Sequence, residues 1–260
     1  MLRNIGALVV FVYAAFCLVL LIYLTRKGKF VPKIRRLAAI DGIEQVVGRC
    51  TEMGAKVHFT PGWDWSPGLA GERAGDFMAG LQVLDYVAYL CAKYNTALVT
   101  TVMKPELVAV SEDITRSAYL RAGKPPDEVH PDVRFLSTEQ LPAAAGVLGI
   151  MARENVRGNI MIGFFGGAAL IMAEAAFNLG AVQVGGVTEF LQAPFFVAAC
   201  DYALIGEEVY AAGAYLSEDP VLRGSIQAQD FVKFVVIPLI ILGAVLQTLG
   251  VPWLGVFLKS

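Results

Sequence analysis

The chain of 260 residues is 56% hydrophobic, and its mean hydropathy of +0.58 is high for a soluble protein. All 23 acidic residues lie between Asp41 and Asp230, together with 12 of the 21 basic residues, so this region carries a formal charge of −11. A surface this acidic repels phosphate backbones, which argues against DNA or RNA as a partner.

The first predicted element is a membrane-spanning helix. Residues 5–24 carry no charge, and about 20 apolar residues in a helix cross a hydrocarbon core about 30 Å thick. A secretory signal peptide carries its positive charge before the apolar segment. Here only Arg3 precedes the segment, and six basic residues follow it, namely Arg26, Lys27, Lys29, Lys33, Arg35 and Arg36. We therefore expect an uncleaved anchor over residues 1–25 and a basic linker over residues 26–37.

A second apolar segment lies near the other end of the chain. Residues 234–258 are again free of charge, which predicts a C-terminal span within residues 231–260. Short flanks rich in Lys and Arg stay in the cytoplasm. The basic linker thus predicts a cell-membrane protein with both termini outside and the central domain, residues 38–230, in the cytoplasm. The lipid bilayer is the first expected partner, and the linker could also bind anionic headgroups.

The central domain begins with a helical pattern and continues with strand patterns. A helix is expected over residues 38–53, with Asp41 placed to cap it and Gly54 to end it. Short apolar runs then predict six strands, at residues 56–60, 97–103, 133–136, 159–165, 181–184 and 202–205. Such runs are typical of strands that are buried on both faces of a parallel sheet.

Helical patterns fill the intervals between these strands, at residues 80–94, 105–120, 138–154, 167–179 and 188–199. Pro105 suits a first helical position, and Ser137 with Gln140 fits a capping box. A last helix begins near Glu207, breaks at residues 217–220 and runs into the second span. The alternation predicts an α/β domain with a doubly wound, mostly parallel, Rossmann-like sheet.

Residues 159–199 admit a competing interpretation as two further membrane helices, because their apolar content is high. Five polar residues interrupt this segment, namely Glu174, Asn178, Gln183, Glu189 and Gln192. No window of 18 residues without a charge occurs in it, and that is the length a span requires. The pattern therefore favours strands and helices of the sheet.

The carboxyl ends of the predicted strands are the expected place for a ligand. Several glycines stand there directly before a helix, where bare backbone N–H groups suit a phosphate. The candidate ligand-binding residues are Gly62, Lys104, Gly166, Gly167, Gly185, Gly186, Thr188, Glu189, Gly206 and Glu207. The glycine fingerprints of dinucleotide sites and of P-loops are both absent. Sharp turns and close packing are therefore the simpler explanation of these glycines.

Catalytic signals are weak. Glu189, Glu207 and Glu208 could hold Mg²⁺ or act in acid–base chemistry, although the helix dipole alone favours acids in a first turn. His58 lies within the first strand, which favours a packed strand residue over a base. The four cysteines are scattered without a C-x-x-C pair, as in proteins of a reducing compartment. The pattern assigns no catalytic residue, metal or cofactor.

The connection predicted at residues 61–79 is long and contains Trp63 and Trp65. Long loops in compact domains are often functional. The two indole rings could cover a ligand, contact a partner, anchor at the membrane interface or pack over the sheet edge, and the sequence does not rank these alternatives.

The segments AIDGIEQVVGRCTEMGAKVHFTPG (residues 39–62), IGFFGGAAL and IGEEVYAAGAYLS carry a family resemblance. Over about residues 30 to 255, the chain resembles an uncharacterised family of membrane-anchored bacterial and archaeal proteins, filed as a domain of unknown function. The resemblance implies an N-terminal span and an α/β body. It implies no catalytic residues.

These observations favour a membrane-tethered scaffold or assembly subunit whose domain self-associates or docks a partner. The alternative is an anchored enzyme or sensor that binds a nucleotide or a phosphorylated small molecule at the glycine-lined edge of the sheet. The absence of a catalytic motif makes the enzyme the weaker interpretation. A transporter is a poor third candidate, because two spans form a pathway only in a large oligomer.

Overall fold

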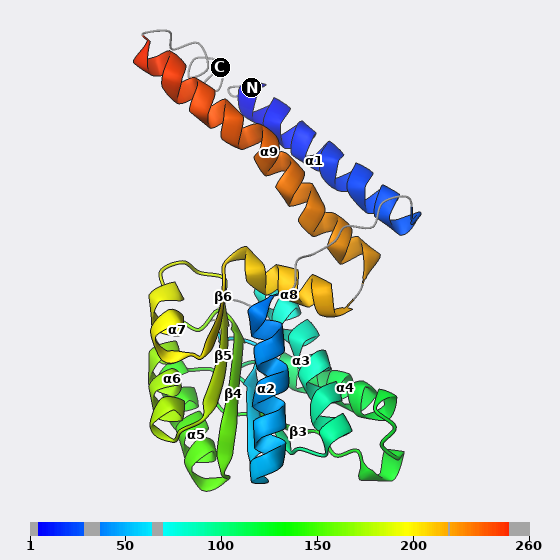
Figure 1. The fold of residues 1–260 in the computed structure, drawn as a ribbon, viewed down its shortest axis with the longest axis vertical. Helices are drawn as coiled ribbons and strands as arrows, with labels where there is room; N and C mark the ends of the chain where they lie inside the picture. The colour runs from blue at the N-terminus through cyan, green and yellow to red at the C-terminus, as the bar shows by residue number, and fades with distance from the viewer. Residues whose placement is uncertain (1–4, 29–36, 64–69, 218, 250–260) are drawn as a thin grey trace. The chain divides into compact units, whose positions relative to one another are not determined.

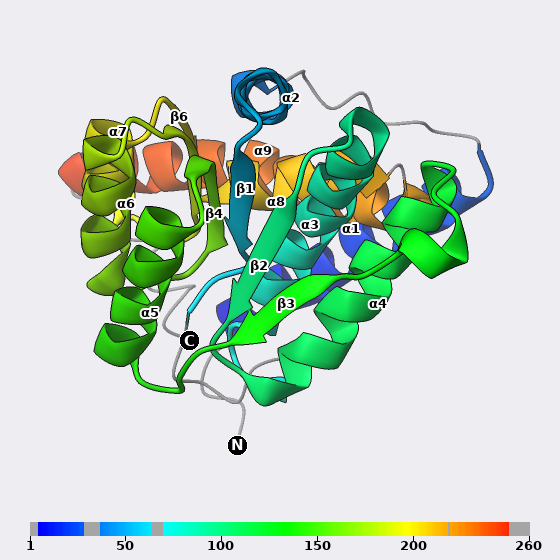
Figure 2. The same cartoon turned by 90° about the horizontal axis from the view of Figure 1, so that it is seen from below.

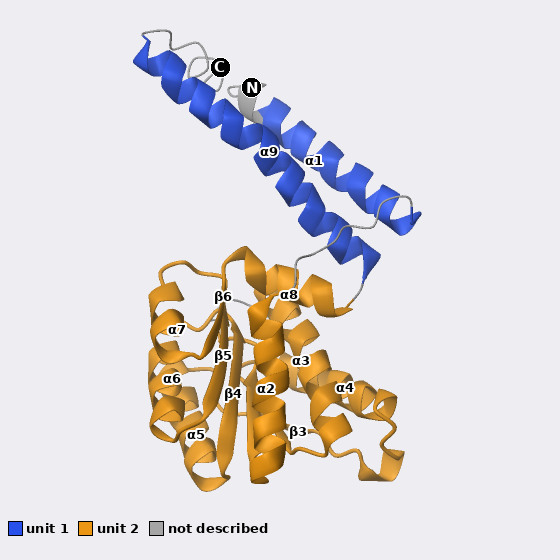
Figure 3. Ribbon diagram, in the orientation of Figure 1, with its two compact units in different colours: residues 1–34, 218–260 blue, residues 35–217 orange. Residues whose placement is uncertain are grey.

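The computed structural model describes residues 5–28, 37–63, 70–217 and 219–249. The chain divides into two compact units (Figures 1 and 3). One unit, residues 1–34 and 218–260, contains the apolar helices, and the other, residues 35–217, is the α/β domain. Each unit is described by itself below.

The first unit contains two long apolar helices, α1 (Ile5–Arg26) and α9 (Pro220–Thr248). Both are long and apolar enough to cross a membrane, because 22 and 29 residues span about 33 and 43 Å at 1.5 Å per residue. Most of their large apolar side chains are exposed, including Phe11, Phe16, Phe234 and Ile240. A core helix of a soluble protein would bury such side chains.

The two apolar helices pack against each other as an antiparallel pair. Near the end of α1, Thr25 and Leu21 lie against Gly224 near the start of α9. A Cβ atom at Gly224 would stand 3.1 Å from the Cα atom of Ile22 and 3.0 Å from the Thr25 hydroxyl. Gly224 and Ala228 are the buried residues of α9. Small residues one turn apart allow this close approach of two helix backbones, as in membrane helix pairs.

The second unit is built on a six-stranded parallel sheet with the order β3-β2-β1-β4-β5-β6. The strands are β1 (Lys56–Thr60), β2 (Leu98–Val102), β3 (Asp132–Phe135), β4 (Val156–Gly163), β5 (Val182–Val187) and β6 (Tyr202–Ile205). The prediction of a doubly wound α/β sheet is confirmed. Residues 159–199 belong to this sheet and its helices, so the competing interpretation as membrane helices is wrong.

Helices cover both faces of the sheet (Figure 2). One face packs against α2 (Ala38–Met53), α3 (Ala74–Tyr94), α4 (Pro105–Arg121) and α8 (Glu207–Ser217). The other face packs against α5 (Gln140–Arg153), α6 (Ala168–Asn178) and α7 (Ala193–Ala199). Each layer has its own apolar core, as buried parallel strands require.

Several predicted helix starts differ from the structure. The helix α3 begins at Ala74, six residues earlier than expected. The N-cap residue of α2 is Leu37, which makes no side-chain capping bond, and Asp41 lies within the first turn, so the expectation that Asp41 is the cap is wrong. The capping box at Ser137 is also wrong. Its hydroxyl accepts from the N–H of Glu139 at 3.0 Å, and Glu139 is itself the N-cap residue of α5. The predicted break between α8 and α9 is confirmed.

A chain of buried polar side chains crosses four strands beneath α5, α6 and α7. His58 lies 2.8 Å from the Thr101 hydroxyl through Nε2 and 2.8 Å from the Asn159 carbonyl oxygen through Nδ1. Asn159 donates to Gln183 at 3.0 Å, and Gln183 donates to two helix carbonyls, those of Ala173 and Ala199. We call Thr101, His58, Asn159 and Gln183 the polar ladder. Each of these four residues is at most 1% exposed, so their polar groups form hydrogen bonds with protein groups and not with water.

The hydrogen bonds of the polar ladder all run in one direction. Because the Asn159 amide N–H₂ donates to Gln183, its oxygen must accept from Nδ1 of His58. The Nε2 atom of His58 then accepts from the Thr101 hydroxyl. This arrangement needs a neutral imidazole, and burial lowers the pKa of His58 to about 4. His58 is therefore a structural residue of the sheet, as its position within a strand predicts, and it has no contact with solvent.

Candidate functional site

The edge formed by the carboxyl ends of the strands is the natural place for a ligand in this fold. The strand order reverses between β1 and β4, because β2 and β3 lie on one side of β1 while β5 and β6 lie beyond β4. Ligands of open α/β sheets bind in the crevice outside this switch point. The connections after β1 and β4 thus decide whether the crevice is open.

In this protein the two connections at the switch point stay in contact and fill the crevice with backbone. The N–H of Trp63 donates to the carbonyl oxygen of Phe164. A Cβ atom at Gly62 would stand 3.1 Å from the backbone of Phe164, and one at Gly163 would stand 2.7 Å from the carbonyl oxygen of Pro61. Both glycines also have positive φ values, 106° and 138°. Gly62 thus serves close packing of two chain segments.

The indole ring of Trp63 closes the crevice further. It is 1% exposed and packs on Phe165, with ring centroids 6.4 Å apart, and Phe165 in turn packs on Phe196. Of the alternatives weighed for this tryptophan, the structure thus supports packing over the sheet edge. Trp65 lies outside the described residues. The Trp63–Phe165 pair thus occupies space beside the described ends of β1 and β4.

The expected position of Gly185 and Gly186 after a strand is wrong. Both lie inside β5, paired with Met161 and Ile162 of β4. A Cβ atom at Gly185 would stand 2.7 Å from the Cys200 sulfur and closer still to Phe196, and one at Gly186 would stand 2.8 Å from Ile162. These glycines let α7 and the neighbouring strand approach the sheet closely, so they are packing residues.

The remaining candidate glycines do lie at the carboxyl edge. Gly166 has a φ of 59° and faces the amide of Gln140, and Gly206 has a φ of 62° and faces the ring of Phe190. Gly167 is the N-cap residue of α6, and a Cβ atom there would meet no atom within 4 Å. Gly166 and Gly206 are thus turn residues with close neighbours, and Gly167 has open space beside it.

A charged cluster missed by the sequence analysis joins four segments at the same edge. The Arg73 guanidinium lies 3.9 Å above the ring of Phe164, 3.3 Å from Glu189 and 3.6 Å from Asp76. Asp76 also accepts a hydrogen bond from Tyr210 of α8. Burial is the larger cause, and this hydrogen bond the next, that raises the pKa of the Tyr210 phenol. Of the predicted site residues, only Glu189 takes part. No sequence motif marks these contacts, which link positions 116 and 134 residues apart.

The other candidate polar residues are spread along the edge. Lys104 is the half-buried N-cap residue of α4. Thr188 follows β5, and its buried hydroxyl has no hydrogen-bond partner among the described residues. Glu207 stands exposed in the first turn of α8. Within the part of the chain that the structure describes, no three His, Cys, Asp or Glu side chains are grouped so that they could hold a metal ion.

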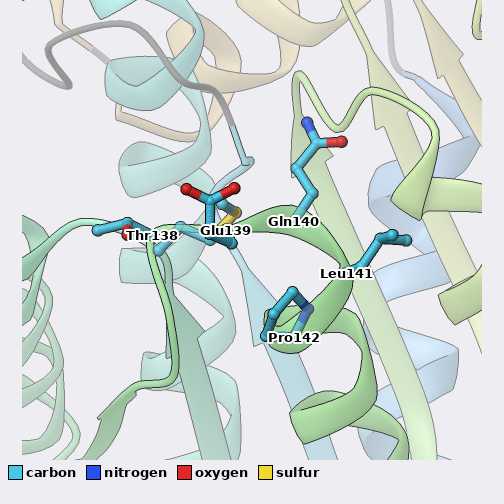
Figure 4. Close-up of a pocket in the computed structure, with 6 residues that line it drawn as sticks. Thr138, Glu139, Gln140, Leu141 and Pro142 are labelled. Atoms are coloured by element: carbon cyan, nitrogen blue, oxygen red, sulfur yellow. The ribbon is translucent and has the colours of Figure 1, made fainter.

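An open pocket of about 440 Å³ lies beside the closed crevice. Its described lining is Met103, which follows β2, and five residues at the start of α5, namely Thr138, Glu139, Gln140, Leu141 and Pro142. Figure 4 shows the Glu139 carboxylate and the Gln140 amide pointing in the same direction. The amide nitrogen of Gln140 is buried, and no described residue is hydrogen-bonded to it. The volume suits a small organic molecule.

The outer surface of α6 and α7 is unusually apolar for an acidic domain. Between Arg157 and Asp201 the only charged residues are Glu174 and Glu189. We define the α6–α7 face as the exposed large apolar side chains of α6, α7 and the turn between β5 and α7, namely Leu170, Ile171, Phe177, Phe190, Leu191, Phe195 and Val197. Phe190 and Leu191 are 72% and 82% exposed. Large apolar patches on a domain surface mark interaction sites.

Strand order and layers define the α/β domain as a Rossmann-like, doubly wound one whose switch point is closed by its own residues. The chain belongs to the family described as a domain of unknown function, DUF6754, whose model matches residues 2–257. No curated protein and no solved structure matches the chain. The family description assigns no activity, so a function must be argued from the geometry of the site and the surface.

Proposed function

We propose that this protein is a membrane-tethered scaffold or assembly subunit whose α/β domain self-associates or docks a partner protein. In this proposal α1 and α9 both span the cell membrane, both termini lie outside, and the domain lies in the cytoplasm. The two apolar helices support this orientation, together with the basic residues at and after the end of α1, of which Arg26 and Lys27 are described.

The α6–α7 face is the observation that carries the proposal. A protein that works alone has no use for seven large apolar side chains on one helical layer, since exposed apolar surface favours aggregation. The rest of the domain is densely charged, because 31 of the 33 charged residues within residues 35–217 lie outside residues 158–200. Such a contrast between one apolar surface and a charged remainder is typical of a docking surface.

Tethering strengthens the proposal because it raises the effective concentration of the domain. Two chains held in one membrane meet far more often than two free domains, so a weak contact between their surfaces becomes significant. The switch point also favours docking over nucleotide binding, because the buried Trp63 and Phe165 rings pack beside the ends of β1 and β4, where open α/β sheets bind their ligands.

The mass of the protein extracted in a mild detergent tests this proposal. We expect a particle heavier than one 27.9 kDa chain, containing either several copies or a second protein in fixed ratio, as measured by native mass spectrometry. A single chain that carries only lipid and detergent, at a protein concentration of several micromolar, would contradict the proposal.

The pocket at the start of α5 favours a second candidate function, the binding of a small molecule. Glu139 is the charged group in its described lining, next to the apolar side chains of Met103, Leu141 and Pro142. An acidic, partly apolar pocket suits an uncharged or cationic ligand better than a phosphate. The sequence pattern of glycines predicts an anionic nucleotide, whereas the pocket favours an uncharged or cationic ligand.

Two matched probes test the second candidate. Titration of the full chain with phenethylamine is expected to raise the unfolding temperature more than titration with 3-phenylpropionate at the same millimolar concentration. The difference should disappear in Glu139→Gln and persist in the control Glu128→Gln, which changes an exposed acid at another pocket. Equal shifts with both probes, or no shift with either, would contradict the ligand class.

A further inference from the structure

We propose that the occupant of the α6–α7 face is the same face of a second copy of this chain, in a two-fold symmetric dimer. The inference rests on the proposed scaffold function and names its partner. Three properties of the face carry it: its charge, its area and its self-complementary chemistry.

The charge of the domain limits where two copies can touch. Two domains repel each other when each carries a formal charge of −7, from 20 acidic and 13 basic residues within residues 35–217. Contact is possible only through a surface with few like charges, because the Debye length is about 8 Å at physiological ionic strength. The segment that forms the α6–α7 face contributes two of the 23 acidic residues. One of these, Glu189, is compensated by Arg73 at 3.3 Å.

The exposed area is of the right size for a dimer. Seven large apolar side chains between 38% and 82% exposed present on the order of 700 Å², given 150–250 Å² for a whole aromatic side chain. Each partner in a standard protein–protein interface contributes roughly 800 Å². The face contains Phe177, Phe190 and Phe195, and aromatic side chains are enriched at the centres of interfaces.

The chemistry of the face fits a copy of itself better than a partner of different charge. In a two-fold dimer one patch meets the same patch, so the surface must be complementary to itself. An uncharged apolar patch meets this condition, whereas a patch with one sign of charge does not. A basic partner protein would gain its electrostatic attraction from the acidic surfaces elsewhere on the domain.

Native mass spectrometry of the full chain in nanodiscs tests the dimer. The wild type is expected at two chains per particle. Phe190→Asp/Leu191→Asp should give one chain at the same protein concentration, because two buried carboxylates would meet their own copies. The matched control is Leu120→Asp, which places the same charge at an exposed leucine of α4 and should stay dimeric. Far-UV circular dichroism should show the same folded spectrum for all variants, since the positions are exposed.

A charge-pair experiment tests whether the face meets itself. Leu191→Asp alone and Leu191→Lys alone should each be monomeric at low ionic strength. A mixture of the two chains should form mixed dimers that contain one of each, and these should dissociate as salt is raised. Recovery of association only in the mixture requires that the same surface of both copies lies in the contact.

The possible results of these experiments distinguish the dimer inference from the scaffold function on which it rests. A dimer that persists in Phe190→Asp/Leu191→Asp would place the contact elsewhere and overturn the inference, while self-association would stand. A monomeric chain that binds a different protein in fixed ratio, lost in the same variant, would also overturn the inference and keep the docking function. A monomer without any partner would overturn both.

Discussion

Replacing Asn159 with leucine is expected to lower the free energy of unfolding by about 3–5 kcal/mol. Leucine fills a similar volume, but it removes the acceptor for Nδ1–H of His58 and the donor to Gln183, which lie 2.8 and 3.0 Å away. Both partners are at most 1% exposed, so water cannot take the place of the lost side chain. Each unpaired buried group costs about 1–3 kcal/mol.

Urea unfolding of the full chain, followed by circular dichroism, measures this loss. The control Asn178→Leu makes the same substitution at the exposed end of α6 and should change the stability by less than about 0.5 kcal/mol. The double variant His58→Leu/Asn159→Leu should lose less than the sum of the two single variants, because it removes both members of one hydrogen bond. Strict additivity would mean that the ladder does not act as a connected network.

The elements that the sequence predicted best are those with local signals at their ends. The helix α2 was predicted over its full length, and its end is fixed by Gly54, which has a φ of 62° and donates to Cys50 and Thr51. Pro105 likewise marks the first turn of α4. The sequence also limits the possible strand orders to those of a doubly wound sheet, because right-handed crossovers between parallel strands allow few other topologies.

Errors arose where distant contacts override a local pattern. The first turn of α3 contains Gly75 and Asp76, which are typical of loops, yet Asp76 is buried beneath Arg73 and Tyr210. The strand β5 continues through Gly185 and Gly186 because Phe196 and Ile162 occupy the space of their missing side chains. No window of sequence around these residues contains the partner that decides their structure.

The candidate site shows the same limit. Its place at the carboxyl edge could be predicted from the fold class alone. The closed crevice could not, because it depends on Trp63 meeting Phe164 and Phe165, about 100 residues further along the chain. The α6–α7 face had a visible signal, the near absence of charge between residues 157 and 201. That signal bears on the choice between membrane helices and elements of the sheet, and sequence alone does not show which apolar side chains point outward.

The closed switch point makes a further prediction, at Gly80 in the second turn of α3. A Cβ atom at Gly80 would stand 2.9 Å from three backbone atoms, the carbonyl oxygens of Ile162 and Pro61 and the Cα atom of Pro61. Backbone atoms of β4 and of the connection after β1 cannot rotate away as a side chain can. We therefore expect Gly80→Ala to destabilise the protein by about 3 kcal/mol, through overpacking.

The sign of this effect is what makes the test informative, because glycine to alanine inside a helix ordinarily stabilises it by about 0.5–1 kcal/mol. Gly48 in α2 provides the matched control, since a Cβ atom there would meet nothing within 4 Å, and Gly48→Ala should raise the free energy of unfolding. Urea unfolding of both variants measures the contrast. A stabilised Gly80→Ala variant would contradict this prediction and would show that α3 can move away from β4 and from the connection after β1.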